Sequence, residues 1–321
     1  MSTEFLGYIL AIITMLIYGV YMAPRKIATS SNGSFTFWMG TGILITSTAI
    51  FLIFHNTKHL IDIKTNCVSV IAGLIWATGN FAYSISITKI ELTRATPLKN
   101  LSAIFGILLG IFIFNEEANK SNFKLIAIII SGIAIIVGAT LLSRVGIGYN
   151  SKKKLLFKDY FIGASLAIWA AIAFSIYTIP MKIAFLKGAS PVGFLFFMSI
   201  GIFIGLTLLA LWSGWKPNIK IFIEDRFQSN KNIEKLSLPI EKNRWLAMLS
   251  GFGFAIGSLF ANYAVKFAGV AITWPITKNS IIAVLFSAFI LKDVDYKSSK
   301  TIFWTGISIS LIGIIFMGLG A

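Results

Sequence analysis

Two lysine–asparagine pairs lie inside apolar stretches of the chain, where charged side chains are rare. Lys99 and Asn100 occur in the segment TPLKN, and Lys278 and Asn279 occur in the segment WPITKN. A lysine at the centre of a membrane span costs about 2.5–3.5 kcal/mol on insertion scales, so two of them at corresponding places indicate a shared role. An ammonium group attracts an anionic or strongly polar ligand, and an amide binds hydroxyl groups. We therefore predict that all four residues bind a substrate in a central aqueous cavity.

A proline precedes each pair, at Pro97 and at Pro275. Proline lacks a backbone N–H group and disturbs the hydrogen bonds of a helix. We therefore expect both prolines to bend their helices and to free carbonyl groups nearby. A lysine that binds such a carbonyl would only hold its helix in place, and this alternative to substrate binding stays open.

A second matching pattern contains Pro24 and Pro180, in the segments YMAPRKIA and YTIPMKIA. We expect both prolines to bend a helix or to mark its end. The lysine two residues further on, Lys26 or Lys182, lies at the end of an apolar stretch, from which its long side chain can extend to the membrane surface. We therefore interpret these two lysines as interfacial.

Aromatic and amide side chains occur in two further segments that match one another, GLIWATGNFAYS and GFGFAIGSLFAN. Two glycines in the first segment, Gly73 and Gly79, match Gly251 and Gly257 in the second, and they predict close packing between helices or local bending. Aromatic rings and amides suit a hydroxyl-rich ligand through stacking and hydrogen bonds; the alternative is that the amides bond to neighbouring helices. The additional candidates for substrate binding are Trp76, Asn80, Tyr83, Asn262 and Trp274.

The composition indicates that membrane helices must hold these residues. Of 321 residues, 56% are hydrophobic and 12% are charged, and the mean hydropathy is +0.83, whereas a soluble domain carries about twice that share of charge. Ten apolar windows are long enough to span a bilayer as helices, which takes about 20 residues. We therefore expect an integral, multi-pass protein of the cell membrane. The predicted spans are 5–23, 34–54, 68–88, 95–114, 122–142, 160–180, 191–212, 246–265, 270–291 and 302–320.

The matching segments lie five spans apart. An odd number of spans in each repeat makes the second copy enter the membrane from the opposite side, as in many secondary transporters. We predict an all-α membrane protein with ten transmembrane helices, arranged as two inverted five-helix repeats. The first repeat covers residues 1–144, a basic linker covers 145–159, and the second repeat covers 160–321 with a polar loop at 213–245.

The charged residues exclude several classes of protein. The net charge of +16 comes from basic residues between the apolar spans, which suits anionic lipid headgroups and does not indicate nucleic acid. The acidic residues fall in loops or at span ends, so we predict no metal site, no catalytic residue and no cofactor. The nucleotide-binding pattern G-x-x-x-x-G-K-[ST] does not occur, and we expect neither an enzyme nor an ATP-driven pump. Glu91 lies beside Lys89 and Arg94, and we interpret it as part of a loop ion pair, with proton transfer as the open alternative.

The segment GLIWATGNFAYS, followed by a span that begins near TPLKN and closes in FNEE, resembles the drug/metabolite transporter superfamily of EamA-like proteins. The pattern looks closest to its glucose/ribose porter group, to which the rhamnose symporter is related. The resemblance implies a sugar or a related metabolite as substrate, and a cavity lined by the first, third, fourth, sixth, eighth and ninth helices. The chain departs from that group at its lysine–asparagine pairs, where such porters tend to have small polar residues, and this departure speaks against a neutral sugar.

These features predict a secondary transporter that moves a small polar metabolite by alternating access, with a sugar or an anionic, phosphorylated sugar-like metabolite as the leading candidate. The alternatives are a membrane-embedded receptor or scaffold with the same fold, and an exporter of amino acids or other metabolites. The expected partners are this substrate and the lipid bilayer, and a homodimer is left open. Basic residues concentrate in the loops after the odd-numbered spans, which predicts termini outside the cell, whereas the resemblance implies termini in the cytoplasm.

Overall fold

The computed structural model describes residues 3–54, 63–116, 122–143, 157–215, 238–279, 281–291 and 296–320 of the chain. Most of these residues are helical, and none of them forms a strand. A helix satisfies its backbone N–H and C=O groups internally, which an apolar segment in a membrane must do. The all-α prediction is therefore confirmed for the described part of the chain.

The helices follow one another along the chain, and several spans consist of short consecutive pieces. In chain order they are α1 (Thr3–Val20), α2 (Ala23–Ile27), α3 (Asn32–Ile53), α4 (Ile63–Ile90), α5 (Leu92–Lys99), α6 (Ser102–Leu108), η2 (Leu109–Ile113), α7 (Asn122–Ser143), α8 (Phe157–Ile176), α9 (Thr178–Leu186), α10 (Pro191–Trp212), α12 (Leu238–Thr277), α13 (Ile281–Phe286), η3 (Ser287–Leu291), η4 (Tyr296–Ser299) and α14 (Lys300–Gly320). Serine side chains begin two of the long helices. Ser31 accepts a hydrogen bond from the backbone N–H of Ser34 at the start of α3, and Ser190 accepts one from Gly193 at the start of α10. These bonds satisfy N–H groups that the start of a helix leaves unpaired.

Eight helical segments of the described chain are long and apolar enough to cross a membrane. One of them, Arg244–Leu291, has 48 residues, more than twice the roughly 20 that a single crossing needs. It bends at Gly269, whose φ of +76° lies in the left-handed region that favours glycine. A further apolar helix, Ile126–Leu142, is shorter. The protein therefore crosses the membrane several times, while the count of ten spans stays a prediction.

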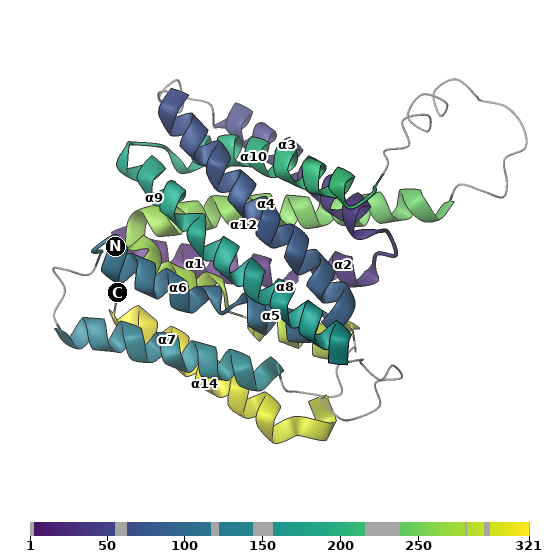
Figure 1. The fold of residues 1–321 in the computed structure, drawn as a ribbon. Coiled ribbons are helices and arrows are strands. Elements are labelled where there is room, and N and C mark those ends of the chain that lie inside the picture. Colours follow the sequence, from purple (N-terminus) through teal and green to yellow (C-terminus); the bar gives the residue numbers. More distant parts are fainter. Residues whose placement is uncertain are drawn as a thin grey trace, which may run out of the picture.

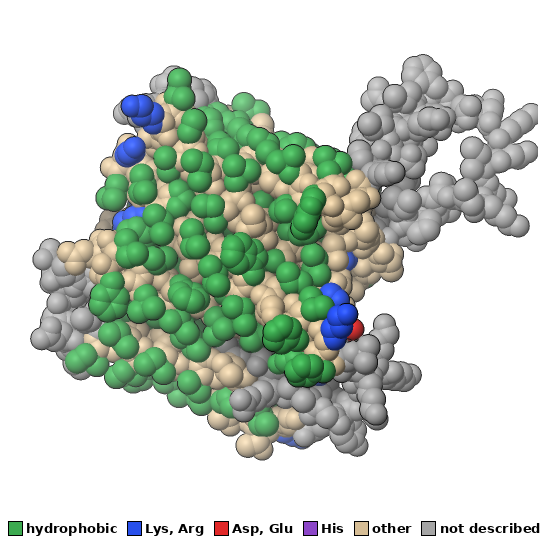
Figure 2. Space-filling model, in the orientation of Figure 1, with side chains coloured by type: hydrophobic (Ala, Val, Ile, Leu, Met, Phe, Trp, Pro, Cys, Tyr) green, Lys and Arg blue, Asp and Glu red, His purple; other side chains and the backbone are tan. Residues whose placement is uncertain are grey.

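The surface of the helix bundle is apolar. Figure 2 shows hydrophobic side chains over most of the visible face, with lysine and arginine near its edges. Large side chains such as Phe112, Ile130 and Leu208 are more than half exposed. A soluble monomer rarely exposes an apolar area of this extent, so these side chains face the hydrocarbon of a bilayer.

Helices from distant parts of the sequence pack in matching pairs. α1 packs along α12, and α8 packs along α4. α3 and α10 contact each other, and they also pack against α12 and α4, respectively. α7 and α14 form a separate pair at the lower side of Figure 1. A core of buried aromatic side chains lies where α1, α4, α8 and α12 meet.

Glycine contacts set the closest approaches between these helices. A Cβ atom added at Gly73 of α4 would overlap the backbone of α10 at Met198, and one added at Gly251 of α12 would overlap the backbone of α3 at Met39. Small residues let membrane helices approach until their backbones touch. Both glycines thus lie in close helix contacts, as the sequence predicts.

Replacing Gly251 with alanine should lower the unfolding temperature in detergent, because the added methyl group pushes α12 away from α3. Overpacking of this kind costs about 1–3 kcal/mol. Gly253→Ala is the matched control on the same helix, since its Cβ would meet Tyr21 at an ordinary distance of 3.4 Å. Equal unfolding temperatures for the two variants would contradict the close contact at Gly251.

Candidate functional site

Interruptions in the helices position the candidate site residues. α1 and α2 are separated at Tyr21, α5 and α6 at Asn100, α8 and α9 at Tyr177, and α12 and α13 at Asn279. The prolines predicted to bend helices each lie about one helical turn from an interruption, at Pro24, Pro97, Pro180 and Pro275. Because proline cannot donate a backbone hydrogen bond, the helix is weakest near these points.

Lys99 and Lys278 adjoin two of the interruptions, and both are buried. Lys99 is the last residue of α5, Lys278 directly follows α12, and each residue is 5% exposed. The Lys278 ammonium lies 4.5 Å from the ring centre of Trp274 and 4.7 Å from that of Tyr18. The Lys99 ammonium lies 4.9 Å from the ring centre of Tyr83. The faces of aromatic rings attract cations at such distances.

The two ammonium groups occupy one neighbourhood although they come from distant parts of the sequence. The ring centre of Phe174 lies 5.6 Å from the Lys278 ammonium, and α5, which ends at Lys99, packs against α13, which begins three residues after Lys278. The hydroxyls of Tyr83 and Thr96 are 2.7 Å apart and hydrogen-bonded, which fixes the ring beside Lys99. We use the term lysine–aromatic cluster for Lys99, Lys278, Tyr18, Tyr83, Phe174 and Trp274.

Neither ammonium group of the cluster has a carboxylate or a carbonyl partner among the described residues. The alternative in which each lysine binds a freed helix carbonyl is therefore not seen in the described part of the chain. Aromatic rings attract a cation but carry no net charge. With both lysines protonated, the cluster thus holds two like charges that its own side chains do not neutralise.

Unpaired polar atoms belong to residues next to the lysines. Asn100 Oδ1, Asn279 Nδ2 and Trp274 Nε1 are buried and have no hydrogen-bond partner among the described residues. Asn279 Oδ1 instead accepts a hydrogen bond of 2.9 Å from the backbone N–H of Ile281, which holds the start of α13. A buried polar group without a partner costs about 1–3 kcal/mol. One acceptor and two donors beside the lysines thus have no hydrogen-bond partner in the described part of the chain.

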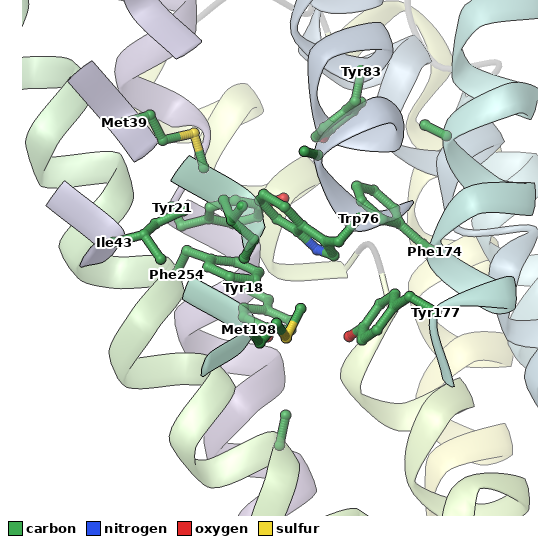
Figure 3. Close-up of a cluster of buried hydrophobic side chains, with 14 of the residues drawn as sticks. Tyr18, Tyr21, Met39, Ile43, Trp76, Tyr83, Phe174, Tyr177, Met198 and Phe254 are labelled. Carbon is green, nitrogen blue, oxygen red and sulfur yellow. The ribbon is translucent and has the colours of Figure 1, made fainter. Parts of the chain in front are cut away.

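Trp76 joins the helices that surround the cluster. Its ring centre lies 4.1 Å from that of Phe254 in α12 and 5.6 Å from that of Phe174 in α8. Figure 3 shows Trp76 between Phe254 on one side and Phe174 on the other, with Tyr18 beside Phe254. The candidate Trp76 therefore lies in the same core as the cluster.

Several aromatic residues of this core were not predicted as site residues. Tyr21 and Tyr177 are buried at two helix interruptions. Both begin the matching segments YMAPRKIA and YTIPMKIA, and this shared position could have marked them as site candidates. Tyr18, Phe174 and Phe254 gave no signal, because the chain contains 28 phenylalanines and 9 tyrosines and their spacing does not tell a core from a lipid-facing position.

Asn80 and Asn262 connect neighbouring helices in the structure. Asn80 Nδ2 donates to Met39 Sδ in α3, and Asn262 Nδ2 donates to the carbonyl of Pro191 in α10, both at 3.4 Å. These contacts agree with the alternative that the sequence left open, in which the two amides bond to neighbouring helices. A binding role for them stays a prediction, although Asn80 Oδ1 is buried without a partner among the described residues.

A lysine–glutamate pair lies at the end of the bundle that contains α2. Lys26 of α2 pairs with Glu91, which separates α4 from α5 with a φ of +72°. Glu91 is thus in an ion pair, as predicted, but its partner comes from α2 instead of its own loop. Lys89, which lies beside Glu91 in the sequence, instead pairs with Asp159 of α8 at 2.8 Å. The interfacial interpretation of Lys26 missed this partner.

Glu116 forms the corresponding pair at the opposite end, where Figure 1 shows α9. Its Oε1 atom lies 2.5 Å from the Lys182 ammonium, and its Oε2 atom accepts hydrogen bonds from the backbone N–H groups of Val270 and Ala271 at 2.6 and 3.0 Å. These two residues begin the part of α12 that follows the bend at Gly269. A carboxylate is favourable at the start of a helix. The interfacial interpretation of Lys182 is therefore incomplete as well.

Arg25 is a buried charge that the sequence reasoning missed. Its Nε donates to Ser84 Oγ at 3.0 Å and its Nη2 donates to Asn32 Oδ1 at 2.5 Å. Its Nη1 reaches the carbonyls of Ala28 and Ser30 at 3.3 Å. The guanidinium therefore joins α2, α3 and α4. A cavity of about 320 Å³ lies nearby between α3, α4 and the end of α10, and none of the predicted site residues lines it.

Replacing Arg25 with glutamine should lower the stability of the protein by about 1.5–3 kcal/mol, the usual contribution of hydrogen bonds to a charged group. Arg94→Gln removes the same charge from a half-buried position and is the control. Thermal unfolding in detergent measures both. An unfolding temperature for Arg25→Gln no lower than that for Arg94→Gln would contradict the role of Arg25 in joining the three helices.

Comparison with known proteins places the whole chain in one family context. A family model described as "Sugar transport protein" matches residues 9–320. A "Putative sugar uptake protein" of Lactobacillus helveticus is 25% identical over 313 residues, which cover 96% of this chain and 99% of the relative. A "Probable glucose uptake protein GlcU" of Staphylococcus aureus is 24% identical over 325 residues, which cover 98% and 99% of the two chains. The relatives thus match this chain from end to end.

A solved structure matches nearly the whole chain, and a eukaryotic relative matches part of it. The solved structure superposes with a TM-score of 0.62 at 12% identity and covers 98% of this chain and 95% of its own, which shows a shared fold. "Transmembrane protein 144 homolog B" of Dictyostelium discoideum is 27% identical over 146 residues, which cover 43% of this chain and 40% of the relative.

Proposed function

Because this chain belongs to the Sugar transport protein family, we propose that it carries its sugar as a secondary transporter that works by alternating access. It is an integral, multi-pass protein of the cell membrane and is not an enzyme. Ten spans in two inverted repeats, over residues 1–144 and 160–321 with the linker 145–159 between them, are part of this proposal. A relation to the drug/metabolite transporter superfamily is part of it too.

The observation that carries the proposal is the lysine–aromatic cluster with its unpaired polar atoms. Its side chains come from α1, α4, α5, α8 and α12, so both halves of the chain would hold the substrate between them. A sugar presents apolar C–H faces and several hydroxyl groups. Aromatic rings can stack on such faces, while free donors and acceptors bind the hydroxyls. A small polar ligand between aromatic walls is the usual content of such a site.

The packing of the helices supports the inverted repeat. The pair of α1 with α12 corresponds to the pair of α8 with α4, and the interruptions at Tyr21 and Asn100 correspond to those at Tyr177 and Asn279. If the first and second halves of the chain are exchanged, each helix pair takes the place of the other. Transporters with inverted repeats bind their substrates near discontinuous helices at the interface of the repeats.

The two lysine–glutamate pairs support alternating access. Lys26 with Glu91 and Lys182 with Glu116 lie at opposite ends of the bundle, and both pairs are formed in this structure. We propose that each pair closes one end of the substrate path. Rocking of one repeat against the other then breaks one pair while the other pair holds, which exposes the cluster to one side of the membrane at a time.

Uptake into proteoliposomes tests the function. Radiolabelled sugars, amino acids and organic acids form the panel, and we expect sugar uptake that excess unlabelled sugar inhibits. Trp76→Phe should lower uptake about 2- to 10-fold, because an aromatic contact contributes about 0.5–1.5 kcal/mol. Trp212→Phe is the control, since Trp212 is 83% exposed at the end of α10. Uptake of amino acids alone would indicate the exporter alternative, and no uptake of any solute would indicate a receptor or scaffold.

Breaking one closure tests the mechanism. Glu116→Gln removes the ion pair with Lys182 and weakens the contact with Ala271, so a thiol reagent should reach an Ala271→Cys reporter several-fold faster. The background is Cys67→Ser, because Cys67 is an exposed thiol. Asp159→Asn is the control, since it breaks the exposed pair with Lys89. The same labelling rate in both variants would argue against Glu116 as a closure.

A further inference from the structure

The charge of the lysine–aromatic cluster is the feature that the proposed function does not explain. Lys99 and Lys278 are both buried, and in the described part of the chain the groups that lie against their ammonium groups are aromatic rings. Carboxylates in the described part of the chain pair with other lysines, Glu91 with Lys26 and Glu116 with Lys182. A neutral sugar would leave both ammonium groups without a counter-charge in an apolar surrounding, which is unfavourable for each of them.

We propose that the transported sugar carries an anionic group, as a sugar acid or a sugar phosphate does, and that this group lies between Lys99 and Lys278 and binds both. This inference rests on the proposed function, since it specifies the sugar that occupies the same site. One anion between two ammonium groups replaces their mutual repulsion with two attractive contacts. Charge-assisted hydrogen bonds of this kind are the strong ones in proteins.

The aromatic rings favour the charged form of both lysines without replacing the anion. Lys278 lies against Tyr18, Phe174 and Trp274, and Lys99 lies against Tyr83. Each ring attracts a cation through its quadrupole. The rings thus hold the two ammonium groups in place inside the bundle, and they leave the net charge for the ligand to balance.

The unpaired polar atoms indicate that the ligand is larger than a free anion. Asn279 Nδ2 and Trp274 Nε1 are neutral donors, and Asn100 Oδ1 is a neutral acceptor. They can bind uncharged groups of a ligand. A hydroxyl group can both donate and accept. A ligand with hydroxyls around its anionic group therefore satisfies the donors and the acceptor together, whereas inorganic phosphate alone uses the site only in part.

Binding to the purified protein in lipid nanodiscs tests this inference. Titration calorimetry compares glucose, glucuronate, glucose 6-phosphate and inorganic phosphate. Glucuronate is the sharpest probe, because it differs from glucose by a carboxylate in place of one hydroxymethyl group. We expect at least one of the two anionic sugars to bind about 10-fold or more tightly than both glucose and inorganic phosphate.

Single substitutions then assign the effect to the lysines. Lys278→Met and Lys99→Met remove one charge each and keep most of the side-chain length, so each should weaken binding of the anionic sugar about 10- to 100-fold. Lys278→Arg, which keeps the charge, should retain more affinity than Lys278→Met. Lys89→Met is the control for loss of an exposed lysine and should bind like the parent protein. The comparison of ligands uses the unaltered protein, so its result does not depend on whether the variants fold.

Three results would overturn the inference. Glucose binding as tightly as glucuronate and glucose 6-phosphate would show a neutral site and would leave sugar transport intact. Inorganic phosphate binding as tightly as the sugar phosphate would show that the sugar contributes nothing. If no sugar of either charge bound or was transported, the proposed function would fail together with the inference.

Discussion

Burying two ammonium groups within one helix bundle is the constraint on which the rest of this structure depends. An isolated charge in an apolar interior is strongly unfavourable, so the helices around Lys99 and Lys278 must supply something that offsets this cost. They supply aromatic faces from α1, α4, α8 and α12. This arrangement requires close packing of those helices, which Gly79 of α4 makes possible against Phe174 of α8 and Gly257 of α12 against Tyr18 of α1.

The helix interruptions connect this core to the ends of the bundle. Each lysine lies where a helix stops and another begins, and the same helices lead to the ion pairs of Glu91 and Glu116. Glu116 also binds the start of the helical segment that carries Lys278 at its other end. A change at either end of the bundle can therefore move the lysines. This mechanical connection is what alternating access needs, since the binding site must respond to opening on one side.

Features that depend on one segment were predictable from the sequence, and features that depend on two were not. The lengths of the apolar segments predicted the helices. The matching positions of Pro97 and Pro275 predicted the helix interruptions beside the lysines. The partner of Glu91 was not predictable, because α2 and α4 meet only through tertiary packing. The same reason applies to Arg25, whose acceptors lie on α3, on α4 and in the segment that follows α2. Tyr21 and Tyr177 were within reach, because the repeat aligns them, but an aligned aromatic residue can equally face lipid.

A structure of the protein with a bound sugar tests the central claim most directly, since the claim concerns where the substrate lies. The protein in nanodiscs with saturating glucuronate or glucose 6-phosphate is suited to electron cryomicroscopy. We predict density for the sugar beside Trp274, with its anionic group in contact with the ammonium groups of both Lys99 and Lys278. Density for the sugar at another place in the bundle, with both lysines in contact only with protein groups, would contradict this account.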